Sequence, residues 1–170
     1  MNPNMTPVDW AKRPIVEKYA DFSGRAPRAE YWWYALALII AFIVLSIVES
    51  MTGLKGMLFG VYGPLTGLLW LATIVPGLAV GVRRLHDTNR SGWWLLLMVP
   101  YVALAIVSAM ALRGGGAGAM AALGTIGLLG ILGLVCAIVM LVFMVLPGTP
   151  GDNRYGPNPY GEGAPAVAAE

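Results

Sequence analysis

The sequence predicts an all-α integral membrane protein, a bundle of four membrane-spanning helices with a short amphipathic helix before it and a folded-back cytoplasmic tail after it. Three observations support this fold class. Only 12% of the 170 residues are charged and 58% are hydrophobic, whereas a typical globular domain has about 25% charged residues. The few charged residues avoid four long stretches of the chain. Most of the basic ones fall on one side of those stretches.

The four long stretches define the predicted spans. Each contains 18 to 27 residues and no Asp, Glu, Lys, Arg or His: Tyr31–Val48, Pro64–Val82, Trp93–Leu112 and Met120–Leu146. Because about 20 helical residues cross the hydrocarbon core of a bilayer, each stretch can span it. A soluble chain of this length could not wrap four helices that are apolar on all sides. We therefore predict a membrane domain over residues 23–159.

The segment before the first span, residues 1–22, is more polar. We expect Met1–Arg13 to be disordered and Pro14–Phe22 to form an amphipathic helix, because Ile15, Tyr19 and Phe22 recur at helical spacing. Such a helix lies either on the inner membrane surface or against the protein's own cytoplasmic face. The sequence alone leaves both placements open.

Basic residues set the expected orientation. Nine of the eleven Lys and Arg residues fall before the first span, between the second and third spans, or after the fourth, whereas only Lys55 and Arg113 fall on the other side. Short loops rich in Lys and Arg stay in the cytoplasm. We therefore expect a multi-pass protein with both termini in the cytoplasm.

Polar residues that could bind a ligand all fall at this cytoplasmic boundary. Arginine presents a planar fork of donors that matches phosphate and carboxylate groups. Glu30 and Asp87 should pair with some of the arginines, because an unpaired charge beside hydrocarbon is costly, and the others would face an anionic headgroup or another anion. The alternative is that the arginines only orient the spans and hold the helix ends together. The candidate residues are Arg25, Arg28, Glu30, Arg83, Arg84, His86, Asp87, Arg90, Asn153, Arg154 and Tyr155.

Catalysis has little support in the sequence. His86 and Asp87 are the only pair resembling a base and its orienting acid, but adjacent helical residues point about 100° apart. Ser91 is the nearest nucleophile, and its position favours capping the third span. A single cysteine, Cys136, and a single histidine cannot form a structural zinc site. We therefore predict no catalytic or metal-binding residues and no cofactor, and an enzyme is the less favoured class.

Two further features bear on partners and on the tail. Gly124, Gly127, Gly130 and Gly133 recur at every third position of the fourth span, and small residues let another helix approach closely. This stripe is either internal packing or the surface of a homo-oligomer. After that span, Pro147–Pro159 mixes turn-forming residues with Arg and Tyr, so we expect it to fold back on the cytoplasmic face. Residues 160–170 should be disordered.

Three polar segments stand out along the chain: Gly24–Trp32, Arg83–Trp94 and Gly151–Pro157. Together they resemble a bacterial inner-membrane family, domain of unknown function 805, and the resemblance extends from about Tyr19 to Pro159. Pro27 stands where the family often has Ser, and Asn89 where it often has Gly; Asn also tolerates the left-handed backbone that Gly would provide. The resemblance implies a four-helix protein of the bacterial cytoplasmic membrane. It also implies that the polar residues above belong to one constellation, but it supplies no reaction or ligand.

The function we predict is therefore a binding module for an anionic lipid headgroup or a partner protein at the cytoplasmic face. Part of the motive is that Pro76 and Pro100 lie at similar depths, where kinks could open a pocket near the arginines. A small transporter or channel subunit is the second hypothesis, although the four spans contain no ionisable residue for an ion path. An enzyme acting on a lipid-linked substrate is the third. We expect membrane lipids, including anionic phospholipid, as partners and no nucleic acid.

Overall fold

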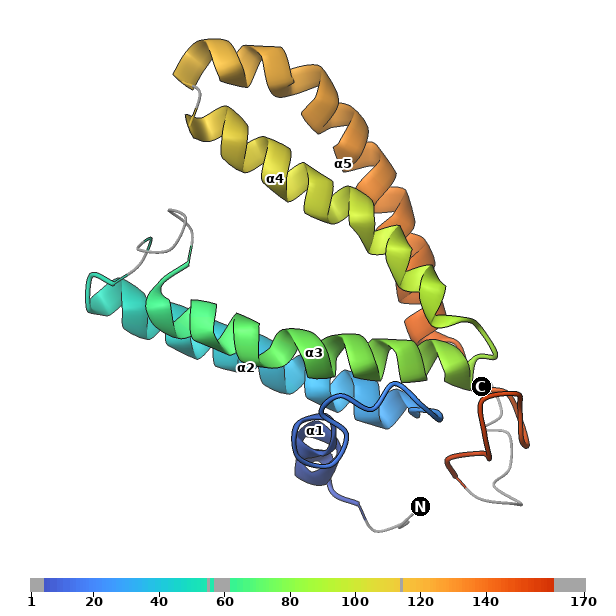
Figure 1. Ribbon diagram of the computed structural model, residues 1–170. Helices are drawn as coiled ribbons and strands as arrows, with labels where there is room; N and C mark the ends of the chain where they lie inside the picture. The colour runs from blue at the N-terminus through green and yellow to red at the C-terminus, as the bar shows by residue number, and fades with distance from the viewer. Residues whose placement is uncertain (1–4, 55, 57–61, 114, 161–170) are drawn as a thin grey trace. The chain divides into compact units, whose positions relative to one another are not determined.

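The structure is a computed structural model that describes residues 5–54, 56, 62–113 and 115–160. Every regular element within these residues is a helix (Figure 1), so the prediction of an all-α fold is confirmed. The helices belong to two compact units. The first unit comprises the described parts of Met1–Arg90 and Pro147–Glu170, and the second comprises Ser91–Leu146. The predicted disorder of residues 1–4 and 161–170 lies outside the described residues.

The first unit is built on an antiparallel helical hairpin. Helix α2 (Arg28–Met51) and helix α3 (Pro64–Asp87) lie side by side, drawn in blue and green in Figure 1. Each has 24 residues and is therefore about 36 Å long at 1.5 Å per residue, enough to cross a bilayer. Large apolar side chains such as Ile39 and Leu68 are exposed along them. Both helices are long and apolar enough to span a membrane, as the sequence predicts for the first two spans.

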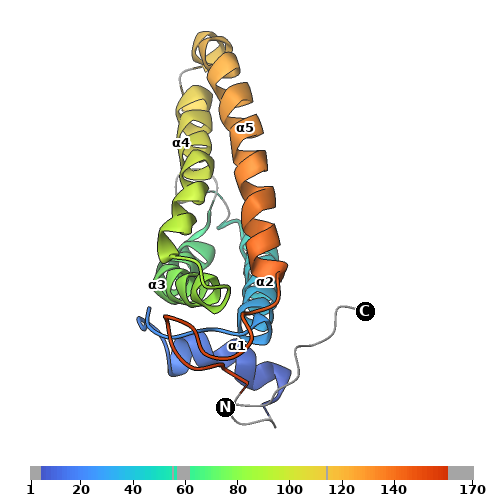
Figure 2. The same ribbon diagram turned by 90° about the vertical axis from the view of Figure 1, so that its right-hand side faces the viewer.

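Helix α1 (Pro7–Val16) corrects the prediction for the N-terminal segment. It crosses the hairpin and contacts both α2 and α3 (Figure 2). It begins at a capping box in which Thr6 and Asp9 bond each other's backbone N–H. Pro14, expected to start a helix, is buried inside α1, and the helix ends at Val16. The predictions of disorder up to Arg13 and of a helix over Pro14–Phe22 are therefore wrong.

The second unit is a hairpin of two helical arms, and its first arm differs from the predicted third span. Residues Gly92–Met98 form a 3₁₀-helix, η1, and Val99–Arg113 form α4. Ser91 caps η1, because its hydroxyl accepts a hydrogen bond from the N–H of Trp93 at 3.4 Å, as predicted. Pro100 lies in the first turn of α4, where its missing N–H costs nothing. It therefore marks a change of helix type rather than a kink within one α-helix.

The second arm is α5 (Gly115–Val145), which begins five residues before the predicted boundary at Met120. Its described part from Leu123 is long and apolar enough to span a membrane. The four glycines of the stripe differ in what lies beside them. A Cβ atom on Gly133 would lie 3.3 Å from the Tyr101 ring of α4, whereas nothing lies within 4 Å of one on Gly124, Gly127 or Gly130 among the described residues.

Candidate functional site

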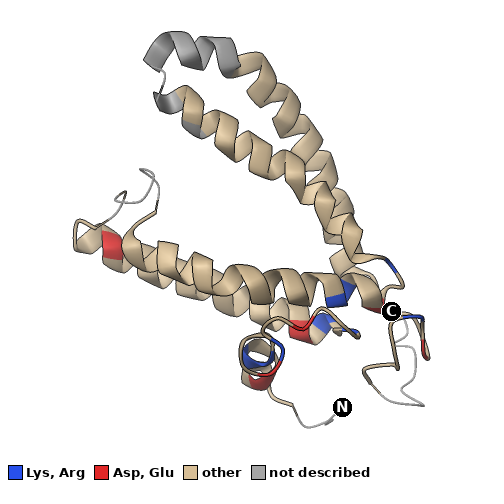
Figure 3. Ribbon diagram, in the orientation of Figure 1, with Lys and Arg blue, Asp and Glu red and all other residues tan. Residues whose placement is uncertain are grey.

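Most charged residues of the α2–α3 hairpin gather at one end, which we call the polar end. It comprises the start of α2, the end of α3, the segment 17–27 and the tail 147–160. In Figure 3 most blue and red positions of the hairpin cluster there, the middle of both helices carries none, and one red position lies at the opposite end, where α2 has Glu49. Several of these charged side chains are almost completely buried. Glu30, Arg84, Arg83 and Asp87 are 0 to 2% exposed, which requires that each charge be paired.

Glu30 joins α1 to α3. Its Oε2 accepts a hydrogen bond from Arg13 Nη1 at 2.9 Å, and its Oε1 accepts one from Arg83 Nη1 at 2.5 Å. A carboxylate placed between two guanidinium groups offsets the desolvation of all three groups better than a single pair would. Glu30 therefore fixes α1 against the hairpin.

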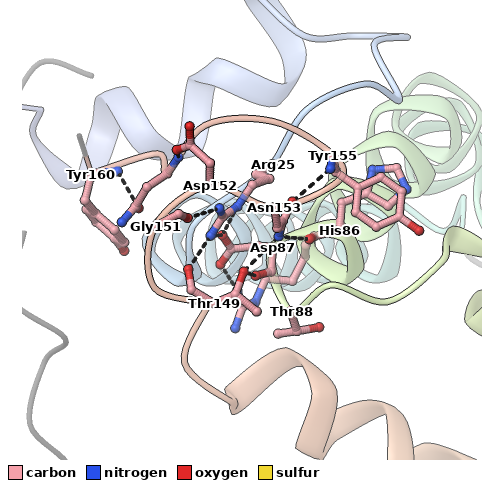
Figure 4. Close-up of polar contacts among 12 residues, drawn as sticks. Arg25, His86, Asp87, Thr88, Thr149, Gly151, Asp152, Asn153, Tyr155 and Tyr160 are labelled. Carbon is pink, nitrogen blue, oxygen red and sulfur yellow. Dashed lines mark hydrogen bonds and ion pairs between the residues drawn. The ribbon is translucent and has the colours of Figure 1, made fainter. Parts of the chain in front are cut away.

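Asp87 is the second bridging carboxylate, and it ties the tail to the end of α3 (Figure 4). Its Oδ1 accepts from Arg25 Nε at 3.0 Å and its Oδ2 from Arg84 Nη1 at 2.5 Å. Arg25 donates its remaining two nitrogens to the tail, Nη2 to the Thr149 carbonyl and Nη1 to the Gly151 carbonyl, both at 2.7 Å. All three nitrogens of Arg25 are thus used within the fold.

The tail also caps the C-terminus of α3, where carbonyl groups lack helical partners. The Thr149 N–H donates to the Asp87 carbonyl at 2.8 Å, and Asn153 Nδ2 donates to the His86 carbonyl at 2.9 Å. Gly148 permits this approach, because a Cβ atom there would overlap the Asp87 carboxylate. The close contact of tail and helix therefore depends on that glycine.

His86 is directed toward structural partners. Its ring stacks on the Tyr155 ring, with centroids 3.8 Å apart and planes 4° from parallel, and its Nδ1 lies 3.2 Å from the Gly24 carbonyl oxygen. The Arg154 guanidinium lies 4.7 Å from the same Tyr155 ring. Asp87 faces Arg25 and Arg84 instead of His86, so the two adjacent residues do not form a base with its orienting acid.

A pocket of about 300 Å³ opens at the polar end. Its basic lining residues are Arg13, Lys18, Arg25 and Arg83, and tail residues 157–159 form one wall. Lys18 pairs with Asp21, and both side chains are about one-third exposed. Because surface ion pairs contribute little free energy, Lys18 can exchange its partner at small cost.

The structure brings most of the predicted site residues into one network but places few of them in the pocket. Only Arg25 and Arg83 line it. Arg28 begins α2 close enough to Arg84 for their charges to interact, and Arg90 Nη1 donates to the Thr88 carbonyl of its own loop at 3.2 Å. The network residues that do not line the pocket are Glu30, Arg84, His86, Asp87, Asn153, Arg154 and Tyr155.

Sequence reasoning missed Arg13 and Lys18. Both precede the recognisable segments, and Arg13 falls in the stretch expected to be disordered. The capping box Thr6-x-x-Asp9 followed by apolar Trp10 and Ala11 is the local signal for an ordered helix that carries Arg13. Lys18 has no such local signal, because its place in the pocket depends on the tail.

The fold and this network define a helical multi-pass membrane protein with a buried arginine–carboxylate network at one end of its helices. The family model "Protein of unknown function (DUF805)" matches residues 19–157, and the chain belongs to this family. It is an integral inner-membrane protein of unknown function.

Two relatives from Escherichia coli (strain K12) support this assignment. "Inner membrane protein YhaH" is 33% identical over 153 residues, which cover 89% of this chain and 97% of the relative. "Inner membrane protein YhaI" is 36% identical over 106 residues, which cover 62% of this chain and 85% of the relative. No solved structure matches the chain.

Proposed function

We propose that this protein is a membrane-embedded module that binds the headgroup of an anionic phospholipid at its cytoplasmic face. The observation that carries the proposal is the convergence of Arg13, Lys18, Arg25 and Arg83 on one pocket. These side chains come from α1, the segment after it and α3. Anionic lipids of the inner leaflet attract basic clusters that lie at the membrane surface.

The placement of the pocket relative to the membrane follows from the proposed topology. Both termini are cytoplasmic, and α2, α3, the η1–α4 arm and α5 cross the membrane as one four-helix bundle. The polar end of the α2–α3 hairpin then lies at the inner headgroup layer. Helix α1 fits the same layer, because it leaves Val8, Ile15 and Val16 exposed while its charged residues hold it to the hairpin.

Native mass spectrometry of protein in nanodiscs tests this function. The nanodiscs contain phosphatidylcholine with a minor fraction of phosphatidylglycerol, and wild type is compared with Lys18→Ala. We expect wild type to retain phosphatidylglycerol selectively. Lys18→Ala should retain about fivefold less, which corresponds to a loss of about 1 kcal/mol of binding free energy. Arg154→Ala is the matched control, because Arg154 does not line the pocket. Equal lipid retention by wild type and Lys18→Ala, or no selectivity in wild type, contradicts the proposal.

The open part of the glycine stripe supports a second, separate proposal on assembly. A Cβ atom on Gly124, Gly127 or Gly130 of α5 would have no atom of the described residues within 4 Å, so α5 can accept another helix there. We propose a homo-oligomer through this face. Gly127→Leu should convert the oligomer to monomer in native mass spectra. An unchanged mass distribution contradicts the proposed oligomer.

A further inference from the structure

Arg83 uses only part of its guanidinium group. Nη1 donates to Glu30, but Nε and Nη2 are buried and have no hydrogen-bond partner among the residues that the structure describes. Arg83 is 1% exposed. A buried donor without a partner costs about 1 to 3 kcal/mol, and a charged one costs more. Natural proteins rarely keep such groups, so the two nitrogens call for an explanation.

The two nitrogens form one edge of the guanidinium plane. Their hydrogens point in the same direction, so this edge can donate two parallel hydrogen bonds to two oxygens of one oxyanion. Arg83 also lines the basic pocket. The side chain that carries the free edge therefore borders the pocket where a ligand can enter.

The protein's own carboxylates around the pocket are already occupied. Glu30 pairs with Arg13 and Arg83 through separate oxygens, Asp87 pairs with Arg25, and Asp21 pairs with Lys18. Within the described residues, none of these carboxylates bonds to the Nε–Nη2 edge. The described carboxylates around the pocket thus leave this edge available to the oxyanion of a bound molecule.

Lys18 and Arg25 differ in what they can offer the same molecule. Arg25 donates all three nitrogens to Asp87 and the tail, so it holds the pocket wall. Lys18 is tied only by a partly exposed pair with Asp21 and is free to turn to a ligand. A bidentate fork with a second cation fits a phosphate ester, because two non-bridging oxygens meet the fork and either of them can accept a further hydrogen bond from Lys18.

We propose that Arg83 binds two non-bridging oxygens of a phosphate ester through Nε and Nη2 and that Lys18 donates to one of the same oxygens. This deepens the proposed headgroup function and rests on it for the lipid source of the phosphate. A phospholipid headgroup and a soluble phosphate ester share this chemistry, so the experiment must separate them.

The decisive variant is Arg83→Lys, which keeps the charge and the pairing with Glu30 but removes the fork. Nanodiscs with phosphatidylglycerol supply the lipid phosphate, and glycerol 1-phosphate in detergent solution supplies the soluble one. We expect Arg83→Lys to bind phosphatidylglycerol about tenfold more weakly than wild type, and Arg154→Lys to bind like wild type. As a second readout, the Arg83 Nε–H signal in NMR spectra of wild type should shift on titration with the bound probe.

Each outcome has a distinct meaning. Equal binding by wild type and Arg83→Lys, with no shift of the Arg83 signal, overturns the bidentate contact while leaving a headgroup site based on charge alone. No selective lipid retention by wild type overturns the proposed function. Binding of glycerol 1-phosphate with an Arg83 shift but without lipid retention supports the fork and overturns its lipid source. The NMR readout uses the wild-type chain, so it does not depend on folding of the variant.

Discussion

The hydroxyl of Tyr19 donates a hydrogen bond to the backbone carbonyl of Ala72, 2.7 Å away. Ala72 lies four residues before Pro76, which is inside α3 and has no N–H to donate to that carbonyl. Tyr19 therefore supplies from another segment the hydrogen bond that the proline removes from the helix. The contact also fixes the segment after α1 to the side of the hairpin.

Removal of the Tyr19 hydroxyl should destabilise the protein only while Pro76 is present. Tyr19→Phe leaves the Ala72 carbonyl without a donor and should lower the free energy of unfolding by about 1 kcal/mol. In a Pro76→Ala background the restored N–H can bond Ala72, and the same substitution should cost much less. Unfolding in mild detergent measures this double-mutant cycle. Equal costs in both backgrounds would refute the compensation.

Loss of the Glu30 charge should be among the most damaging single changes at the polar end. Glu30→Gln leaves buried Arg83 and half-buried Arg13 beside a neutral group, and breaking a buried pair costs about 3 to 5 kcal/mol. Glu17→Gln is the matched control, because Glu17 contacts the same Arg13 but its side chain is 61% exposed. It should cost less than about 1 kcal/mol. Similar melting temperatures for the two variants would show that Glu30 is not the anchor of α1.

Gly148→Ala should detach the tail from α3. The added methyl group would overlap the Asp87 carboxylate, which Arg25 and Arg84 hold in place. Overpacking of this kind costs about 1 to 3 kcal/mol. Hydrogen exchange should show faster exchange at the Thr149 amide. The control is Gly124→Ala, where nothing described lies within 4 Å, and unchanged protection of Thr149 in Gly148→Ala would contradict the prediction.

Asn89 occupies a left-handed backbone conformation, with φ of +58°, as its comparison with Gly in the family predicts. Asn89→Gly should leave stability nearly unchanged, whereas Asn89→Ala should lower the free energy of unfolding by about 1 kcal/mol. Thermal unfolding in detergent compares the two variants directly. An alanine variant as stable as the glycine variant would argue that the backbone there relaxes freely.

The pKa of Asp21 should show whether Lys18 is paired with it. The Lys18 ammonium and the Ser23 hydroxyl and N–H hold the pKa of Asp21 well below its ordinary value. Because the folded-state pKa is lowered, the stabilisation is complete above the ordinary pKa of about 4 and is lost as the pH falls through the lower folded value. Carboxyl NMR should show this in wild type, and the Asp21 pKa should rise toward its ordinary value in Lys18→Ala or when a phosphate ester captures Lys18. An Asp21 that titrates normally in wild type contradicts the pairing.

The spans could be predicted because a membrane-spanning helix is recognised by a long stretch without charged residues. No Asp, Glu, Lys, Arg or His interrupts Tyr31–Val48 or Pro64–Val82, and α2 and α3 contain these stretches entirely. The position of α1 could not be predicted from apolar periodicity, because Pro14 suggested a helix start although the capping box lies at Thr6 and Asp9. Likewise, Pro100 suggested a kink, whereas it stands where η1 gives way to α4.

The membership of the polar network was more predictable than its geometry. The excess of arginine indicated that Glu30 and Asp87 would be paired, and both are. Which arginine would keep an unused edge could not be read from the sequence, because it depends on contacts between distant segments. Arg25, for example, is saturated only because carbonyls at Thr149 and Gly151 reach it from the far end of the chain.

The first unit is built from two separate parts of the chain, and this has a consequence for biosynthesis. Its helices are complete once residue 90 has been made, but the Thr149 amide and the Asn153 amide group that cap α3 come from beyond the last membrane helix. The ribosome must therefore finish nearly the whole chain before Arg25 and the end of α3 find all their partners. A chain that stops early leaves carbonyls at the end of α3 uncapped and leaves Arg25 with Asp87 but without its tail carbonyls. The tail thus distinguishes a finished molecule from a truncated one.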